Sequence, residues 1–344
     1  MTTQTLVTKH DRSGALIEAG KIANNSAARS VFADYRSRKA DNTLRRQDAA
    51  LALFSEFLAE SAGHAPTAEA LATEPEAWRG VTWGLVDGFA KWLLLRGYAV
   101  GTVNVRLSTV KSYAKLAAKS GAIDARELAM IATVSGYSRK EGRRIDERRE
   151  AASIPTRTGH KKREPVVLSK SQADALKSQP DTPQGRRDAV LVRLMLDLGL
   201  RCGEVAGLTV GDVDIKAGEL RVYRPKVDVE QTHALINGLQ AALTAYLEHD
   251  APPLGALLRS SRRGGELAGV GMGERAITER VRYLGERVGI EGLSAHDLRH
   301  TWATQAARNG TALDRLQDAG GWASLAMPAR YVEAARVANE GVRL

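Results

Sequence analysis

One segment of the chain combines an imidazole and a guanidinium with a predicted helix start. Ser294 is a favoured N-cap residue, and His296 and Arg299 follow it three residues apart. Their spacing places both side chains on one helical face. Unpaired N–H groups at a helix start attract anions, and the arginine fork matches phosphate oxygens. The segment is therefore a candidate anion site, although an ordinary amphipathic surface helix is the simpler interpretation of this fragment taken alone.

A second arginine lies where another helix is predicted to end. Gly199 stops an apolar helix, Arg201 follows at the bend, and Glu204 comes three residues later. A carboxylate at this spacing orients an arginine fork by hydrogen bonds. The simpler interpretation is a local surface ion pair, which contributes little.

Two aromatic residues near the C-terminus carry hydrogen-bonding or nucleophilic groups. Gly320 and Gly321 precede Trp322, and Tyr331 follows nine residues later, in a helix opened by Pro328. A tyrosine with a packed ring and a half-exposed hydroxyl is common. Core packing is therefore the alternative for Tyr331 taken alone.

Mostly helices, with a small β element, would position these residues. Residues 219–224 and 227–235 alternate as two strands around a turn that contains Pro225 and Lys226. Residues 251–273 are typical of a loop. Apolar periodicity predicts helices within 42–132 (two of them at 86–95 and 102–119), then at 169–177, 186–198, 239–247, 274–287, 295–308, 312–318 and 328–338.

Composition divides the chain into four parts. Residues 1–38 are polar and weakly patterned, which predicts a flexible N-terminal tail with at most one short helix. Residues 39–135 are helical, 136–164 form a linker, and 165–344 form a second domain. The window 139–164 holds ten Lys and Arg against five Asp and Glu, a net charge of +5. A linker along a polyanion would carry such a charge.

The whole chain has the composition of a basic, two-domain globular protein. Its 344 residues are 43% hydrophobic and 26% charged, with a net charge of +10 and a pI of about 9.8, typical of nucleic-acid binders. The single cysteine, Cys202, excludes an intramolecular disulfide and cysteine-rich zinc sites. The N-terminus lacks a signal-peptide core, and no apolar run is long enough to span a membrane. These features predict a soluble cytoplasmic protein.

Together, the motifs resemble a known family, the tyrosine site-specific recombinases or phage integrases. The resemblance covers about residues 40–344 and depends on five motifs in order. They are Gly199-Leu-Arg201-x-x-Glu204, Lys226 in the strand turn, His296-x-x-Arg299, Gly-Gly-Trp322 and Tyr331. Trp322 after two glycines, with the short N-terminal segment, is similar to the Cre type of simple recombinase.

The resemblance implies a fold and an activity. The fold would be mainly α with a small β element. A helical core DNA-binding domain (39–135), a basic linker (136–164) and a mixed α/β catalytic domain (165–344) would form a C-shaped clamp on DNA. The activity would be cutting and rejoining of DNA through a 3′-phosphotyrosyl intermediate and a four-way junction, without metal, ATP or other cofactor. The last helix, with Val332, Ala335, Val337 and Ala338, would dock on a neighbouring protomer.

The resemblance also assigns roles to residues. Tyr331 would be the nucleophile, while Arg201 and Arg299 would bind the non-bridging phosphate oxygens. His296 and Trp322 would donate further hydrogen bonds. Lys226 would protonate the leaving oxygen, with Lys216 as its nearest competitor, and Glu204 would orient Arg201. The family's members are bacterial or phage-encoded, and the resemblance implies double-stranded DNA with an inverted-repeat site as the partner.

The resemblance also implies an oligomeric state. The protein would be a homotetramer on two such sites and a monomer or weak oligomer when free. Whether accessory proteins take part is left open.

Several basic and polar residues are predicted to contact DNA from their position alone. Lys111, Lys115 and Lys119 recur every four residues, so they form either a solvated helix face or a phosphate-binding stripe. The predicted DNA contacts are Arg106, Ser108, Lys111, Lys115, Arg143, Arg144, Lys161 and Lys162.

Three other functions are compatible with parts of the pattern. A type IB topoisomerase shares the tyrosine, two arginines, lysine and histidine. A regulatory or architectural DNA-binding protein could retain the fold without the reaction, although no catalytic position is missing here. A generic basic helical DNA-binding protein would need the motif spacings to be fortuitous.

Overall fold

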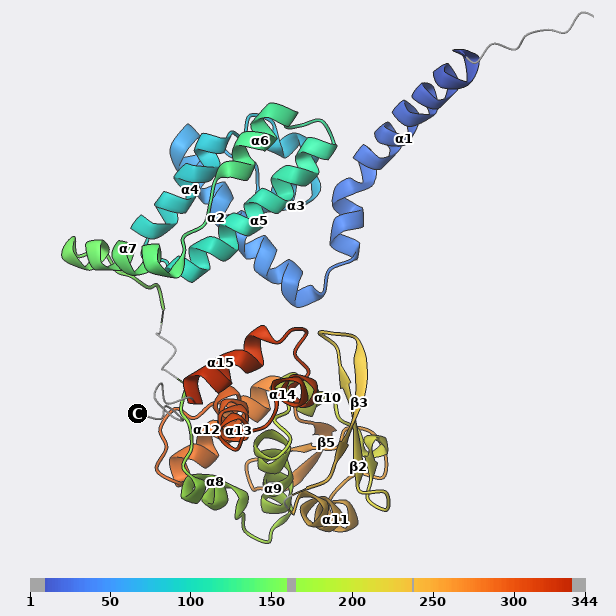
Figure 1. Cartoon of the computed structure of the whole chain (residues 1–344), viewed down its shortest axis with the longest axis vertical. Coiled ribbons are helices and arrows are strands. Elements are labelled where there is room, and N and C mark those ends of the chain that lie inside the picture. Colours follow the sequence, from blue (N-terminus) through green and yellow to red (C-terminus); the bar gives the residue numbers. More distant parts are fainter. Residues whose placement is uncertain (1–9, 160–164, 237, 336–344) are drawn as a thin grey trace, which may run out of the picture. The chain divides into compact units, whose positions relative to one another are not determined.

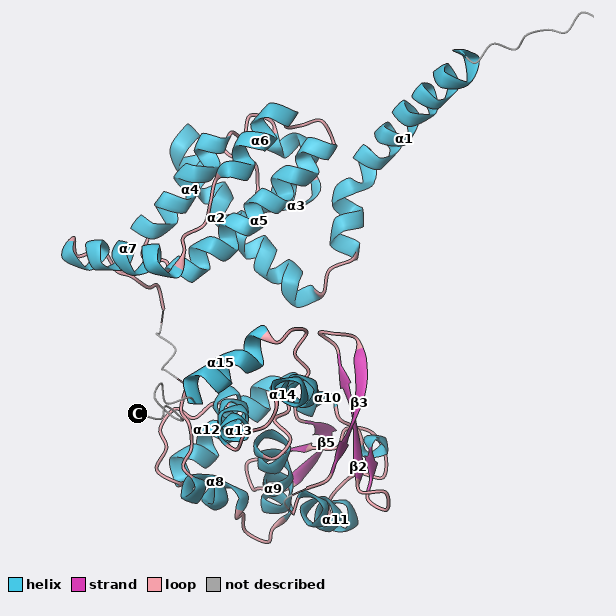
Figure 2. Ribbon diagram, in the orientation of Figure 1, coloured by secondary structure: helices cyan, strands magenta, loops and turns pink. Residues whose placement is uncertain are grey.

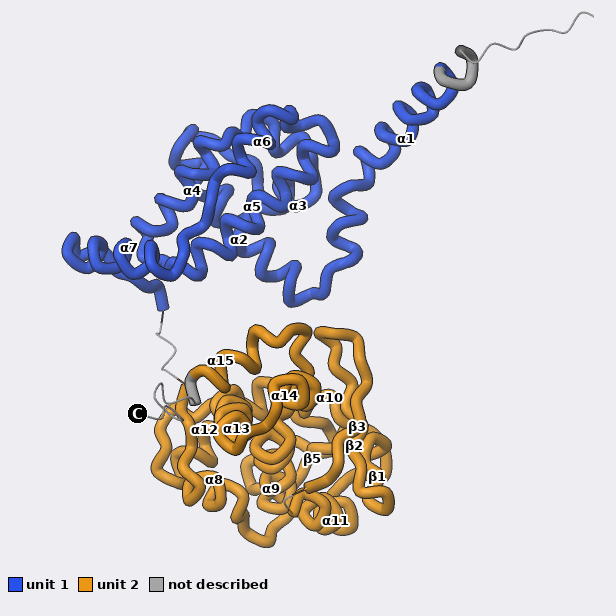
Figure 3. Tube along the Cα trace, viewed as in Figure 1, with its two compact units in different colours: residues 1–162 blue, residues 163–344 orange. Residues whose placement is uncertain are grey.

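The computed structural model describes residues 10–159, 165–236 and 238–335, and it is mostly helical with two small sheets (Figures 1 and 2). The chain divides into two compact units, residues 1–162 and 163–344 (Figure 3). The predicted mainly helical fold class is therefore confirmed, while the C-shaped clamp stays a prediction. Within the described residues, no helix is long and apolar enough to cross a membrane.

Unit 1 contains only helices among its described residues. The α-helices are α1 (His10–Ser37), α2 (Asp41–Ala62), α3 (Ala68–Thr73), α4 (Trp83–Leu95), α5 (Val100–Lys119), α6 (Ala125–Thr133) and α7 (Arg139–Ala151), with a 3₁₀ turn at Pro75–Trp78. Their apolar faces meet around an aromatic cluster. Trp78 is fully buried there and stacks on Phe54 and Tyr113. Aromatic side chains bury large areas, so this cluster accounts for much of the unit's stability.

The prediction of a flexible tail over residues 1–38 is wrong for the described part of this segment. Helix α1 occupies His10–Ser37, and only its last turns join the core. Phe32 is buried there, and Arg36 binds both Asp48 and the hydroxyl of Tyr113. Since Leu16 and other apolar residues of the first turns are exposed, the helix lacks the continuous apolar stripe that sequence periodicity detects.

The predicted linker, 136–164, also differs from the structure. Its first half forms α7, which begins with a reciprocal capping box between Ser138 and Glu141. Near its end, buried Arg149 donates hydrogen bonds to the carbonyls of Tyr98 and Pro155. The charge of this segment concealed its helical pattern, although the Ser-x-x-Glu spacing is a helix-start signal.

Unit 2 combines helices with two antiparallel sheets. Its helices are α8 (Lys170–Lys177), α9 (Pro183–Leu196), α10 (Cys202–Gly207), α11 (Leu239–His249), α12 (Glu274–Arg287), α13 (Ala295–Arg308), α14 (Leu313–Gly320) and α15 (Ala326–Ala335), with a 3₁₀ turn at Val210–Asp212. Helix α9 lies in the core, where Leu191, Leu194 and Met195 are fully buried. It packs against α8, α11 and α13, so the residues that follow α9 emerge from the centre of the unit.

The larger sheet has the strand order β1 (Val213–Asp214), β2 (Glu219–Arg224) and β3 (Val229–Ala234). Residues of β2 alternate between exposed and buried, so Leu220, Val222 and Arg224 point into the unit. Arg224 pairs with Val229 at the base of the turn that carries Lys226. Both predicted strands are thus present, around the predicted turn.

A second hairpin lies in the segment predicted as a loop, 251–273. Strands β4 (Arg259–Ser261) and β5 (Leu267–Gly271) pair there. The Arg259 side chain donates to the carbonyls of Leu267 and Ala268. Short strands rich in serine and glycine give little periodic signal, which explains why the sequence did not predict this hairpin.

Candidate active site

Arg201 and Glu204 are brought together by the tight turn between α9 and α10. Gly199 adopts a left-handed backbone, with φ of +64°, and a Cβ there would lie 2.2 Å from the ring of Trp302. Glycine thus satisfies both the turn and the close approach of α13. Arg201 caps α10, where its backbone N–H donates to Glu204 Oε2 at 2.8 Å and its Nη1 donates to Oε1 at 2.6 Å. Glu204 is buried.

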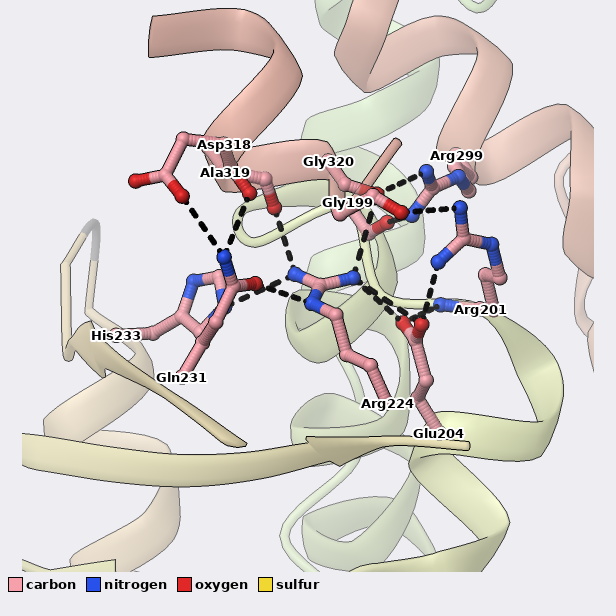
Figure 4. A network of polar contacts seen from close by, with 11 residues as sticks. Gly199, Arg201, Glu204, Arg224, Gln231, His233, Arg299, Asp318, Ala319 and Gly320 are labelled. Atoms are coloured by element: carbon pink, nitrogen blue, oxygen red, sulfur yellow. Dashed lines mark hydrogen bonds and ion pairs between the residues drawn. The ribbon is translucent and has the colours of Figure 1, made fainter. Parts of the chain in front are cut away.

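Arg299 enters the same region from α13. The helix starts with a capping box between Ser294 and Asp297, which sets the position of its first turns. The buried Arg299 guanidinium donates to the carbonyls of Gly199 and Gly320, the latter at 2.6 Å. Arg201 donates to the next carbonyl, Gly321, at 2.9 Å. The two predicted phosphate-binding arginines therefore bind neighbouring carbonyls at the end of α14 (Figure 4).

A third arginine, Arg224 of β2, completes the cluster and was missed by sequence reasoning. Its side chain is fully buried, and its Nη1 lies 3.1 Å from both oxygens of Glu204. Figure 4 shows it between Glu204 on one side and Gln231 and His233 of β3 on the other. An arginine in phase with the buried residues Leu220 and Val222 is the signal that could have found it.

The cluster carries excess positive charge in a buried setting, with three guanidiniums around one carboxylate. Burial opposes ionisation of Glu204, but the hydrogen bond from the Arg201 backbone and the charge of Arg224 keep its pKa below the ordinary value. Burial and the charge of Arg201 lower the pKa of Arg299 to about 9. A bound anion would reverse this effect on Arg299, because an opposite charge favours the charged form. The arrangement suits a phosphate group.

Tyr331 and Trp322 lie beside the arginine cluster. The Arg299 guanidinium is 4.7 Å from the Trp322 ring centroid, and that ring is 5.7 Å from the Tyr331 ring. Trp322 is held at its backbone by Gln317, which both accepts from its N–H and donates to its carbonyl. Tyr331 is 7% exposed, and burial raises its pKa while Arg299 partly offsets the rise. The phenol is therefore neutral at rest.

The remaining two predicted catalytic residues lie at the surface of unit 2. His296 is exposed in the first turn of α13, and Lys226 is exposed in the turn between β2 and β3. Pro225 suits the second position of that turn, which the Val227 N–H closes by donating to the carbonyl of Arg224. His300, which the sequence did not assign to the site, has its ring 5.2 Å from that of Tyr331.

One predicted DNA contact, Lys111, has a different environment from the one expected. Its Nζ donates to the carbonyls of Ala132 and Val134, so it caps the C-terminal end of α6. Partial burial, together with the charge of Lys115, lowers its pKa. Lys111 therefore holds the end of α6 in this structure, because unsatisfied carbonyls at a helix end attract a nearby ammonium group. Its contact with DNA stays a prediction.

The other predicted contacts are arranged variously. Ser108, Lys115, Arg143 and Arg144 are exposed. The Arg106 guanidinium lies 3.9 Å from the Tyr98 ring centroid, a stacked arrangement typical of a cation–π contact. Lys161 and Lys162 lie outside the described residues, as do Val337 and Ala338 of the predicted terminal helix.

Comparison with known proteins identifies the family of the chain. Residues 166–337, half of the chain, match the sequence profile of the Phage integrase family. This range contains all seven predicted catalytic residues. The chain therefore belongs to the phage integrase family of tyrosine recombinases.

Curated relatives are similar over part of their length. The tyrosine recombinase XerC of Herpetosiphon aurantiacus is 28% identical over 48% of this chain and 55% of its own length. XerC of Natranaerobius thermophilus is 26% identical over 70% and 74%, respectively. XerD of Neisseria meningitidis serogroup B is 30% identical over 52% and 62%. The chain thus spans between about half and three quarters of these relatives, and the finer likeness to the Cre type stays a prediction.

Solved structures share the fold at low sequence identity. The Tn1549 transposon integrase in complex with transposon right end DNA is 14% identical, with a TM-score of 0.61 over 88% of this chain and 94% of that one. A lambda integrase dimer bound to a COC′ core site is also 14% identical, with a TM-score of 0.58 over 88% and 92%. At this identity the likeness concerns the fold.

Proposed function

We propose that this protein is a site-specific recombinase that cuts and rejoins double-stranded DNA through a covalent tyrosine intermediate. The observation that carries the proposal is the arrangement of Arg201, Arg299, Trp322 and Tyr331 around one buried, positively charged cluster. A phosphodiester fits this arrangement, because the two arginine forks would bind its oxygens and the adjacent phenol would attack its phosphorus.

The proposed reaction begins when the Tyr331 oxygen attacks the scissile phosphorus. The new tyrosine–phosphorus bond forms as the bond to the 5′-oxygen breaks, which leaves a 3′-phosphotyrosyl link and a free 5′-hydroxyl. Lys226 supplies the proton to the leaving oxygen, and His296 takes the tyrosine proton. A 5′-hydroxyl of a partner duplex then attacks the phosphotyrosyl phosphorus and loses its proton. The new phosphodiester forms as the tyrosine–phosphorus bond breaks, and the Tyr331 oxygen regains a proton. Two such exchanges pass through a four-way junction.

The two arginines would act mainly on the transition state. Negative charge builds on the non-bridging oxygens as the tyrosine attacks, and preorganised donors stabilise that charge. Arg201 and Arg299 are held by carbonyl and carboxylate acceptors, so they would need little reorganisation. Trp322 would donate its indole N–H to one of the same oxygens. Two DNA sites with inverted repeats would hold four copies of the chain. The exposed basic residues of unit 1 would contact the phosphate backbone of the DNA.

The proposal is tested by trapping the covalent intermediate. Wild type and Tyr331→Phe would be incubated with supercoiled plasmids that carry DNA fragments flanking the gene, in the presence of a chelator, and quenched with detergent. We expect a protein–DNA adduct from wild type and none from the variant, because phenylalanine lacks the nucleophilic oxygen. A second plasmid series with two copies of the reactive fragment then measures exchange between sites.

The outcomes separate the competing functions. Adduct with exchange between two sites supports a recombinase. Adduct with relaxation of single-site plasmids, and no exchange, indicates a topoisomerase. Tight binding to a fragment without adduct, for wild type under all of these conditions, contradicts the proposal and supports a regulatory DNA-binding protein.

A further inference from the structure

We propose that Arg224 is a positioning residue that aligns the two candidate phosphate-binding arginines, Arg201 and Arg299. Arg224 itself is fully buried, so it would act through its neighbours rather than by touching DNA. The inference rests on the proposed function, because it assigns Arg224 a role in the same site. It adds a residue that lies outside the motifs from which the site was first predicted.

The first connection runs through Glu204. Both oxygens of this carboxylate accept from Nη1 of Arg224, at 3.1 Å each. The same two oxygens accept from the backbone and the side chain of Arg201. With Arg224 in place the carboxylate plane is held from both sides, which sets the direction of the Arg201 fork. Without it, Glu204 would be free to rotate with Arg201.

The second connection runs through the last turn of α14. The Gly320 carbonyl accepts from both Arg224 and Arg299, at 3.3 and 2.6 Å. Arg224 also binds the preceding carbonyl, Ala319, at 2.7 Å. Terminal carbonyls of a helix have no intrahelical partners, so these bonds hold the helix end in place. Arg299 and Arg201 both donate to that end, and Trp322 directly follows it.

Close packing reinforces this connection. Gly321, the C-cap of α14, has a φ of +56°, and a Cβ there would lie 2.4 Å from Cδ of Arg224. The glycine backbone therefore lies directly on the Arg224 side chain. This contact explains why the residue before Trp322 is a glycine in this chain.

Only an arginine fits the hydrogen bonding at position 224. The guanidinium has five N–H groups in a planar fork, and the structure gives it five partner residues: Glu204, Gln231, His233, Ala319 and Gly320. Gln231 is in turn tied to Asp318 of α14 at 2.9 Å. A lysine would keep the charge but has three donors at a single point, so it would leave some of these acceptors unpaired.

The kinetic test uses Arg224→Lys, with Arg221→Lys as the matched control. Arg221 lies on the exposed face of the same strand and donates to the Gly211 carbonyl. Single-turnover adduct formation would be measured on the DNA that wild type cleaves, with either an ordinary phosphodiester or an uncharged methylphosphonate at the scissile position. We expect the rate constant of adduct formation on the phosphodiester to fall ~10- to 100-fold in Arg224→Lys, because its phosphate-binding arginines are misaligned. The fall on the methylphosphonate should be clearly smaller. Arg221→Lys should match wild type on both substrates.

The comparison of substrates distinguishes positioning from general destabilisation. A methylphosphonate develops less negative charge, so aligned arginines matter less for its cleavage. An equal loss on both substrates, or no loss on either, would overturn the inference.

A second measurement needs no DNA. Hydrogen exchange of residues 313–322 would be compared in free wild type, Arg224→Lys and Arg221→Lys. We expect exchange in this segment to rise by roughly tenfold only in Arg224→Lys, because the helix end loses its donor. Unchanged exchange would contradict the inference directly. If wild type forms no adduct on any DNA, the proposed function fails, while this measurement still tests whether Arg224 holds the end of α14.

Discussion

At the scale of single residues, the site is governed by an excess of positive over negative charge, because most acceptors of its arginines are neutral carbonyls. Three guanidiniums share the carboxylate of Glu204 and the carbonyls of two glycine-containing turns. Carbonyl dipoles hold arginine side chains in place without neutralising their charge. The cluster is therefore both ordered and positively charged before any ligand arrives. This combination is what a transition state with growing negative charge requires.

His233 gives this cluster a sensitivity to pH. Because the Arg224 guanidinium only donates, His233 must accept through Nε2, 3.1 Å away, which requires a neutral ring. Burial and the charge of Arg224 lower its pKa below 6.5, while Glu204 and Asp318 oppose the shift. The unfolded chain therefore takes up this proton first as pH falls below about 6.5. Stability contributed by His233 is present above that pH and is lost as pH falls towards the folded-state pKa.

We predict that His233→Gln flattens this dependence, because the glutamine oxygen accepts a hydrogen bond but does not titrate. The free energy of unfolding would be measured by urea titration between pH 7.5 and 5 for both proteins. As pH falls, the free energy of unfolding should decrease more for wild type than for the variant. His300, whose pKa is also lowered by burial, contributes equally to both proteins. Parallel pH profiles would show that His233 is not the titrating group.

At the scale of elements, helix ends and hairpins place the chemistry. The start of α10 places Arg201, the first turns of α13 place Arg299, and the end of α14 places Trp322. Each is a position where backbone groups lack intrahelical partners and accept or donate bonds to side chains. The β2–β3 hairpin adds Arg224 at its buried base and Lys226 at its exposed turn. One short hairpin thus supplies a buried residue and an exposed residue to the site.

The two lysines of α5 should respond differently to charge reversal. Lys111→Glu places a carboxylate against two carbonyls at the end of α6, so we expect a lower thermal stability of unit 1. Lys115 is exposed, so Lys115→Glu should leave stability unchanged and weaken DNA binding. Removing one lysine–phosphate interaction reduces the slope of log affinity against log salt by about 1. Binding titrations at several salt concentrations, alongside thermal melts, measure both effects.

Lys115→Arg is the control, since it keeps the charge and should bind as wild type does. An unchanged salt slope for Lys115→Glu would show that this face of α5 does not contact DNA. The two lysines are best tested separately, because a double substitution would combine a folding defect with a binding defect.

At the scale of the whole molecule, each unit has a large apolar core of its own among the described residues. Aromatic residues around Trp78 build the core of unit 1, whereas aliphatic residues of α9 such as Leu194 build that of unit 2. Both side chains are fully buried. Each core is large enough to support cooperative unfolding of its own unit.

We therefore predict two transitions in calorimetry of the full chain. Trp78→Ala should destabilise the first unit by about 3–5 kcal/mol and Leu194→Ala the second by about 2–5 kcal/mol. Each variant should shift one transition and leave the other in place. A single transition that moves with either substitution would show that the units unfold together.

The sequence by itself determined the family motifs, most helices and the two main strands. These depend on local spacing: three residues between His296 and Arg299, alternation along β2, and glycines at helix ends. The tertiary structure decided which charged groups face each other. In the sequence, Arg224 is an ordinary strand residue and Lys111 an ordinary surface lysine. Packing brings Glu204 against Arg224 and the end of α6 against Lys111. Spacing along a chain sets which face a side chain is on, but only packing sets which unpaired carbonyls and carboxylates that face will meet.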